Sequence, residues 1–338
     1  MDNFIKNIEI KDWVLLKDIE IKTDASINVF IGDNGTGKSQ LLGLINAYGK
    51  GIEEERDRVD DEGEDVSRQR MRKYVRDYLK HSTRDLTTYI TVNQTKFKYT
   101  HHPETTGRKS SKKIKIEVPE ETQYRNTVYI PAKEVLSLSW MTKLGHFGKR
   151  LSLNPVYPEI ITAAQQLELQ EIASIGVAIV PQLEQLINGR VVVMDDDSFW
   201  IEKVDGTIFP LDLEAEGFRK VGLLWLLLMN EQIAEGTVLV WDEPEANLNP
   251  KLIPVIANIL LILARQGVQI FLATHDYFLP QYLNTLKEDT DELLFHSLYK
   301  TKDGVQCETE EDFTLLDHNR ILEEVVKLYN LKIEKADI

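Results

Sequence analysis

The octapeptide at residues 32–39, Gly-Asp-Asn-Gly-Thr-Gly-Lys-Ser, most constrains how this chain can fold. It matches the pattern G-x-x-x-x-G-K-[S/T], in which successive backbone N–H groups surround a phosphate group. The apolar run 27–31 precedes it, and the apolar-periodic stretch 41–45 follows it. Because the motif needs a strand before the loop and a helix after it, this context favours a phosphate-binding loop over a chance glycine-rich turn.

The residues of this loop have separate predicted roles. Lys38 is expected to reach the β- and γ-phosphates of a nucleotide, and the hydroxyl of Ser39 is expected to bind Mg2+. The predicted nucleotide contacts in and beside the loop are Gly32, Asn34, Gly35, Thr36, Gly37, Lys38, Ser39 and Gln40. The segment therefore predicts a triphosphate that binds together with magnesium.

Composition limits the class of protein. With 338 residues, 42% of them hydrophobic, the chain can form one large α/β domain or two modest ones. A net charge of −15 repels nucleic-acid phosphates at long range, so DNA contact would need a local basic patch. The single cysteine, Cys307, excludes an internal disulfide framework and fits a reducing compartment. Because no signal-peptide layout or bilayer-length apolar run is visible, we expect a cytoplasmic protein without membrane contact.

Hydrophobic periodicity predicts the order of elements. Strands are expected at 4–10, 14–21, 27–31, 89–92, 96–99, 113–118 and 127–130. The charge-dense segment 51–85 is interpreted as an exposed helical or partly mobile insertion. Residues 158–188 are expected to be helical, and residues 191–209 to form a strand cluster. After these come helix 217–234, strand 238–241, helix 250–266, strand 268–273, helix 277–287 and strand 293–299. Such alternation of strands and helices predicts parallel βα units.

A second motif is the apolar strand that ends in two carboxylates, Asp242 and Glu243. Asp242 at the strand tip can hold Mg2+ through water, and Glu243 can polarise the water that attacks the γ-phosphate. The alternative is an acidic turn after a buried strand. The phosphate loop in the same chain favours the catalytic interpretation.

A third motif follows one helix later, where the apolar segment 271–273 ends in Thr274, His275 and Asp276. If this strand lies beside the strand of Asp242, the imidazole of His275 will lie near the γ-phosphate. A lone histidine can also be a structural residue with satisfied hydrogen bonds. With the other two motifs present, we favour a functional histidine.

Together the three motifs resemble those of ABC-type ATPase heads, the class that includes SMC-like chromosome proteins and ABC transporter subunits. Residues 242–250, Asp-Glu-Pro-Glu-Ala-Asn-Leu-Asn-Pro, and 128–132, Val-Tyr-Ile-Pro-Ala, are similar to bacterial AAA-type ATPases related to the overcoming-lysogenization-defect (OLD) nucleases. Many of those relatives act in anti-phage or toxin–antitoxin systems. The resemblance implies an α/β P-loop NTPase fold, with a mainly parallel core sheet flanked by helices, an N-terminal antiparallel β subdomain and a helical insertion.

The resemblance also implies a domain plan. Residues 1–338 would form one ABC-type ATPase domain. Residues 51–125 would hold the charged insertion with antiparallel strands, and 150–210 a helical and β-hairpin insertion. Residues 211–300 would carry a signature-like helix, the carboxylate strand and the histidine segment.

The resemblance implies further roles for individual residues. Lys38, Glu243 and His275 would be catalytic, with His275 sensing the γ-phosphate, and Asn247 would lie in the segment that meets a partner subunit. Gly217 and Arg219, in the signature-like string 213–220, would contact the partner's nucleotide.

Three features depart from the family pattern or leave a role open. The usual signature serine is replaced by Ala215 or Glu216, so a carboxylate would face phosphate unless Arg219 or Lys220 offsets it. No glutamine follows the strand 128–130, where Lys133 and Glu134 stand instead, so the metal-binding glutamine is unassigned. Trp13 is placed where a residue could stack on adenine, although core packing is favoured for a lone tryptophan.

The three motifs and the family resemblance together predict a dimeric, ATP-gated switch that uses Mg2+ with ATP. Two or more copies would close on shared ATP and control a separate effector, such as a nuclease or toxin in anti-phage defence, because too few residues follow His275 for a nuclease domain. One alternative is a transporter nucleotide-binding subunit, which would need the usual signature serine. The other is an SMC-like DNA-repair ATPase, but segment 51–85 lacks the heptads of a coiled-coil arm. The basic clusters 108–113 and 143–150 are more typical of exposed loops than of a DNA site.

Overall fold

The computed structural model describes residues 4–13, 15–60, 86–102, 111–117, 126–140, 156–166 and 174–336. At its centre lies a six-stranded sheet in the order β14-β13-β3-β12-β11-β7. Its strands are β3 (Ile27–Gly32), β7 (Thr127–Ile130), β11 (Val238–Asp242), β12 (Gln269–Ala273), β13 (Leu293–Thr301) and β14 (Gly304–Glu310). Neighbouring strands are parallel from β13 to β7, and only β14 is antiparallel to its neighbour. The mainly parallel sheet predicted from the sequence is therefore confirmed.

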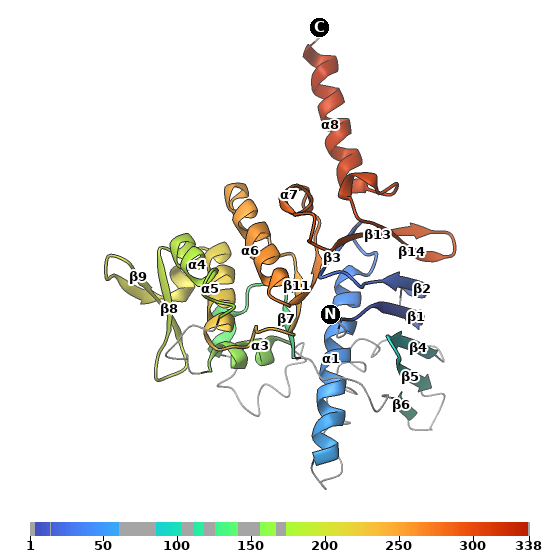
Figure 1. Ribbon diagram of the computed structural model, residues 1–338, viewed down its shortest axis with the longest axis horizontal. Coiled ribbons are helices and arrows are strands. Elements are labelled where there is room, and N and C mark those ends of the chain that lie inside the picture. Colours follow the sequence, from blue (N-terminus) through green and yellow to red (C-terminus); the bar gives the residue numbers. More distant parts are fainter. Residues whose placement is uncertain are drawn as a thin grey trace.

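Both faces of this sheet are buried, as the alternating side chains of its strands show. On β3, Val29 and Ile31 belong to one hydrophobic core and Phe30 to another. The helices are α1 (Lys38–Asp60), α3 (Val156–Ala164), α4 (Val180–Ile187), α5 (Glu216–Met229), α6 (Ile253–Arg265), α7 (Phe278–Leu286) and α8 (Arg320–Ala336). Side chains of α3 to α7 join the first core, whereas α1 joins the second. Helices therefore cover the two faces from opposite sides (Figure 1).

A five-stranded antiparallel sheet in the order β2-β1-β4-β5-β6 adds side chains of β2, β1 and β4 to the second core. Its strands are β1 (Asn7–Trp13), β2 (Leu16–Lys22), β4 (Leu86–Val92), β5 (Thr95–His102) and β6 (Ser111–Glu117). They lie beside α1 in Figure 1. The predicted antiparallel subdomain is thus confirmed. Trp13 is only 2% exposed within this core, which favours the packing interpretation over adenine stacking.

Residues 158–188, expected to be helical, are not one continuous helix. Two helices, α3 and α4, are present, and residues 174–179 between them form turns. The Ile179 N–H bonds to the Gly176 carbonyl, and Pro181 then stands in the first turn of α4. Glycine and proline therefore interrupt the helical pattern here. The chain continues into a three-stranded sheet of β8 (Gly189–Val193), β9 (Phe199–Lys203) and β10 (Ile208–Pro210). These strands correspond to the strand cluster predicted at 191–209.

Several predicted segments lie wholly or partly outside the described residues. These are 61–85 of the charged segment, 108–110 of the first basic cluster and the whole second cluster, 143–150. Helix α1 continues into the charged segment as far as Asp60, beyond the predicted apolar stretch. Within the described ranges, no helix is both long and apolar enough to cross a membrane.

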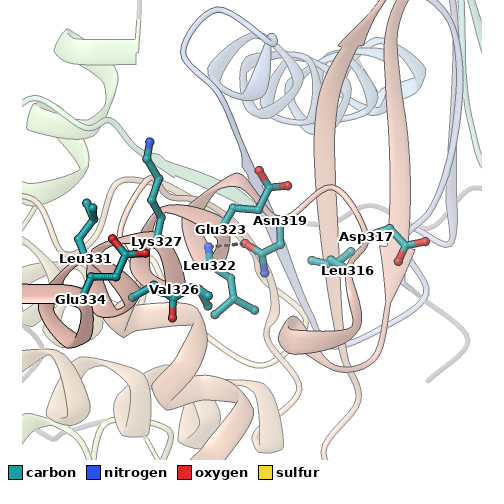
Figure 2. A pocket seen from close by; sticks show the side chains of 10 residues that line it. Leu316, Asp317, Asn319, Leu322, Glu323, Val326, Lys327, Leu331 and Glu334 are labelled. Atoms are coloured by element: carbon teal, nitrogen blue, oxygen red, sulfur yellow. Dashed lines mark hydrogen bonds between the residues drawn. The ribbon is translucent and has the colours of Figure 1, made fainter. Parts of the chain in front are cut away.

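No element is predicted after residue 299, yet the chain continues through β14, the short 3-10 helix η4 (Phe313–Leu315) and α8. Helix α8 projects away from the body in Figure 1. Several of its apolar side chains are exposed, namely Val325, Val326, Leu328, Tyr329, Leu331 and Ile333. Figure 2 shows a hollow along this helix, lined by residues from Leu316, before the helix, to Glu334, near its end. Its volume is about 510 Å³.

A buried histidine, His296, joins strands β13, β3 and β14. Its Nε2 lies 3.1 Å from the Asn28 side-chain oxygen, its Nδ1 lies 2.9 Å from the Thr309 hydroxyl, and its ring stacks on Phe30. Burial lowers the pKa of His296 to about 3 from an ordinary value of 6.5. The imidazole is therefore neutral in the folded protein at physiological pH.

This histidine predicts a specific loss of stability in acid. Below pH 6.5 the unfolded chain takes up a proton that the folded chain rejects until about pH 3, so stability falls across this window. Between pH 7 and pH 5 the wild type is expected to lose about 2 kcal/mol more unfolding free energy than a His296→Gln variant. Urea unfolding at both pH values measures this difference, and equal losses in the two proteins would contradict the prediction.

Candidate functional site

The three sequence motifs meet at one edge of the central sheet. Strand β12 lies between β3 and β11, and Ala273 at its end is paired with both Phe30 and Asp242. The backbone continues this alignment, since Glu243 N–H bonds to the Ala273 carbonyl and Thr274 N–H bonds to the Phe30 carbonyl. Because all three strands are parallel, the loops at their carboxyl ends face the same crevice.

The phosphate-loop segment curls tightly between β3 and α1. Gly32 has a φ of +136°, and a Cβ there would lie 2.1 Å from the Leu298 carbonyl oxygen on β13, so only glycine fits. The Lys38 ammonium donates hydrogen bonds to the carbonyls of Gly32, at 2.7 Å, and Asp33, at 3.0 Å. Burial lowers the pKa of Lys38 to about 8, although the charge of Asp242 opposes this shift. The loop thus encloses a lysine that faces the carboxylate strand.

Ser39 and Asp242, the two predicted magnesium ligands, lie next to each other. The Asp242 carboxyl group is buried, which raises its pKa, and a hydrogen bond from the Ser39 side chain acts in the opposite direction. Mg2+ in nucleotide sites is bound by one or two protein oxygens, with phosphates and waters as the other ligands. The hydroxyl and carboxylate oxygens present here fit that chemistry.

Glu243 and His275 form the open side of the site. The His275 Nε2 lies 3.7 Å from the Glu243 Oε1, and both side chains are more than one third exposed. Partial burial and, to a smaller extent, the charge of Lys38 lower the pKa of His275, so the imidazole is neutral near pH 7. A carboxylate and a neutral imidazole therefore stand side by side, where they can orient a water molecule.

The backbone turns sharply after Asp242. Glu243 and Asn247 both have left-handed backbone, with φ values of 48° and 65°. The Ala246 N–H bonds to the Glu243 carbonyl, which closes a tight turn and leaves the Asn247 side chain exposed. We refer to residues 243–248 as the Glu243 turn.

Gly217, at the start of α5, packs against this turn in its own chain. A Cβ at Gly217 would lie 2.5 Å from the Asn247 carbonyl oxygen, so contact with the Glu243 turn requires glycine here. The helix begins after Ala215 without a side-chain cap. Its first N–H groups are therefore available to an anion, as expected of a helix N-terminus.

Arg219, predicted to offset a carboxylate near phosphate, is held within its own chain. Its guanidinium donates to the Asp212 carbonyl at 3.2 Å and lies 3.4 Å from the Glu134 carboxylate. Glu134 also accepts hydrogen bonds from the N–H groups of Leu136 and Ser137. Glu134, near the position that lacked the expected glutamine, is thus a buried carboxylate that anchors α5. Burial lowers the pKa of Lys220, and the charges of Glu245 and then Glu216 oppose this shift.

Sequence reasoning missed Glu245 at the site, and it named Lys220 only as an alternative to Arg219 for offsetting a carboxylate near phosphate. Lys220 is 2% exposed, and Glu245 has a buried carboxylate oxygen. Burial lowers the pKa of Lys220 and raises that of Glu245 to about 7. One signal was available: Lys220 directly precedes the apolar run 221–229, where a charge has no packing role.

Comparison with known proteins gives one family match. The model of the family described as "AAA domain, putative AbiEii toxin, Type IV TA system" matches residues 44–279, which is more than half of the chain. The matched region holds the carboxylate strand and His275, while the phosphate-loop segment lies just before it. A comparison with curated proteins gave no match.

Solved structures with a similar fold include heads of SMC proteins. An SMC head bound to the C-terminal winged-helix domain of ScpA aligns with a TM-score of 0.52 at 12% identity, over 91% of this chain and 97% of that one. The SMC head domain from Thermotoga maritima has a TM-score of 0.46 at 12% identity, over 90% and 98%. An ATP-binding cassette of an ABC transporter, in its ADP conformation, has a TM-score of 0.42 at 12% identity, over 96% and 99%.

Proposed function

Because the chain belongs to the family of AAA domains described as putative AbiEii toxin, type IV toxin–antitoxin system, and has the P-loop NTPase fold of SMC heads, we propose that it is a Mg-ATP-hydrolysing switch. Two copies would close on shared ATP molecules, and hydrolysis would separate them. The closed state would control a separate effector, such as a nuclease or toxin in bacterial defence.

The observation that carries the proposal is the convergence of Lys38, Asp242, Glu243 and His275 at three aligned strand ends. Lys38 is suited to bind the β- and γ-phosphates, and Asp242 with Ser39 to hold Mg2+. Glu243 would accept a proton from the attacking water, while His275 beside it would sense the γ-phosphate. The lysine, the metal-binding oxygens, the carboxylate and the histidine proposed for phosphoryl transfer to water thus come from one chain.

Dimerisation is supported by the start of α5 and by the Glu243 turn that packs against it. The uncapped start of α5 and the exposed Asn247 side chain would contact the partner's nucleotide and its loop.

The direct test is ATP turnover by the purified protein. Phosphate release from ATP is expected only with Mg2+ present, and GTP should be compared with ATP in the same assay. Co-expression with the product of the adjacent gene tests the effector: growth arrest that depends on an intact nucleotide site supports the switch. A protein that neither binds nor hydrolyses ATP, alone or with its neighbour, would overturn the proposal.

Two measurements separate this function from the alternatives. Stable recovery in the membrane fraction would favour a transporter subunit. ATP-dependent DNA binding that weakens steeply with salt would favour an SMC-like repair ATPase.

A further inference from the structure

A buried lysine beside the Glu243 turn and a half-buried glutamate within it have no part in the function described so far. Lys220, on α5, donates a hydrogen bond from its ammonium group to the Glu243 carbonyl oxygen at 3.2 Å. Glu245, within the turn, accepts a hydrogen bond from the Thr274 hydroxyl on the neighbouring loop. The other Glu245 carboxylate oxygen, Oε2, is buried and has no hydrogen-bond partner in the described part of the chain.

Packing alone does not account for these charges. Lys220 is followed by the buried apolar side chains of α5, where an aliphatic residue would pack as well. Burial of an ammonium or carboxylate group is unfavourable unless it is paired, and loss of water lowers the pKa of Lys220 accordingly. Four carboxylates, those of Glu245, Glu216, Glu243 and Asp242, act against that shift.

The Lys220 contact restrains the backbone of the proposed catalytic residue. Glu243 adopts left-handed backbone, which a residue with a side chain rarely adopts unless its surroundings impose it. Its N–H bonds to the Ala273 carbonyl at 2.8 Å, and its carbonyl accepts from both Ala246 N–H and the Lys220 ammonium. Lys220 is therefore the side chain that links this conformation to α5.

Glu245 restrains the same turn from the other side. The Thr274 hydroxyl that donates to Glu245 also accepts from the Asp276 N–H at 2.9 Å, so the residues on both sides of His275 are held. Asp276 in turn caps the start of α7 through the N–H groups of Phe278 and Leu279. The turn that carries Glu243 and the loop that carries His275 are thus joined through Glu245.

We propose that Lys220 and Glu245 are positioning residues for ATP hydrolysis, an inference that rests on the proposed function. Lys220 ties the Glu243 turn to α5, and Glu245 ties it to the His275 loop. The Glu243 carboxylate would then be aligned for attack only while the start of α5 keeps its place. A displacement of that helix by a partner subunit would change hydrolysis without contact between α5 and the nucleotide of the same chain.

The test compares Lys220→Met with Lys220→Arg, and Glu245→Ala with Glu245→Gln. Misplacement of a reacting group by about 1 Å can reduce turnover about 100-fold. We expect kcat of Lys220→Met and Glu245→Ala to fall about 10- to 100-fold in single-turnover hydrolysis. The dissociation constant for ATP should stay within about twofold, since neither residue contacts the phosphate loop.

Lys220→Arg and Glu245→Gln should recover much of the activity, because the guanidinium can donate to the Glu243 carbonyl and the amide oxygen can accept from Thr274.

Lys251→Met, at an exposed lysine beside α6, serves as the matched control and should turn over ATP like the wild type. A wild-type kcat in both Lys220→Met and Glu245→Ala overturns the inference. Parallel losses of ATP binding and turnover, without rescue by the conservative variants, also overturn it, because they indicate a general structural role. If a thermal unfolding curve shows that Lys220→Met is not folded, the kcat of Glu245→Ala tests the inference. Lack of hydrolysis by the wild type would instead contradict the proposed function.

Discussion

Replacement of Lys38 by alanine is expected to abolish ATP hydrolysis, with turnover lower by about 100- to 1000-fold or more. The Lys38 ammonium is buried within the phosphate loop and now binds the carbonyls of Gly32 and Asp33. In the nucleotide complex the same donor would neutralise charge on the β- and γ-phosphates. Phosphate release and equilibrium binding of a fluorescent ATP analogue measure the two effects, and both should be lost together.

Lys22→Ala is a suitable control for this experiment, because Lys22 is an exposed lysine on β2 that forms an ion pair with Asp24. It should bind and hydrolyse ATP like the wild type. A thermal unfolding curve of Lys38→Ala separates loss of function from loss of folding. Hydrolysis by a folded Lys38→Ala protein at a rate close to wild type would show that the loop at residues 32–39 is not the nucleotide anchor.

Replacement of Glu243 by glutamine is expected to separate binding from hydrolysis. Glutamine has the same shape, so the turn and its contact with Lys220 can persist, but the amide cannot accept a proton from water. Turnover should fall by about 100- to 10,000-fold while ATP affinity is retained. Because the closed dimer would no longer be opened by hydrolysis, the variant should elute as a dimer in size-exclusion chromatography with Mg-ATP and as a smaller species without it.

Glu324→Gln provides the control for the loss of one carboxylate, since the Glu324 side chain on α8 is 72% exposed. This variant should hydrolyse ATP normally and should not accumulate as a dimer. Residual turnover within about tenfold of wild type would count against the role of Glu243. A monomeric Glu243→Gln protein saturated with ATP would instead contradict the dimeric switch while leaving the nucleotide site intact.

Much of the fold was predictable because its signals are local. The strand before the loop, the loop itself and the first turns of α1 are adjacent in sequence, and glycine positions in the loop are visible without a structure. The same holds for β11 and β12, whose apolar runs end in polar residues. Gly176 and Pro181, which interrupt the helical pattern of residues 158–188, are also local signals. They are weak against the apolar helical spacing around them, so the prediction of a continuous helix was wrong.

The C-terminal elements show where local signals fail. Helix α8 mixes exposed apolar residues with charges of both signs, and two of its ion pairs, Arg320–Glu323 and Lys327–Glu324, are between residues of the same helix. Such a pattern gives little indication of what the helix packs against. Its position, projecting from the body, follows from the path of β13, β14 and η4 rather than from its own sequence.

A phosphate loop, a carboxylate pair and a histidine, each after an apolar strand, are visible in the residues alone. The packing of the folded chain makes these strands neighbours, so that His275 lies 3.7 Å from Glu243 and Ser39 lies beside Asp242. It also decided the partners of the charges, which place Arg219 on Glu134 and Lys220 on the Glu243 carbonyl. The physical reason is that strand order and side-chain pairing depend on packing between residues distant in sequence, whereas a motif is encoded within a few consecutive residues.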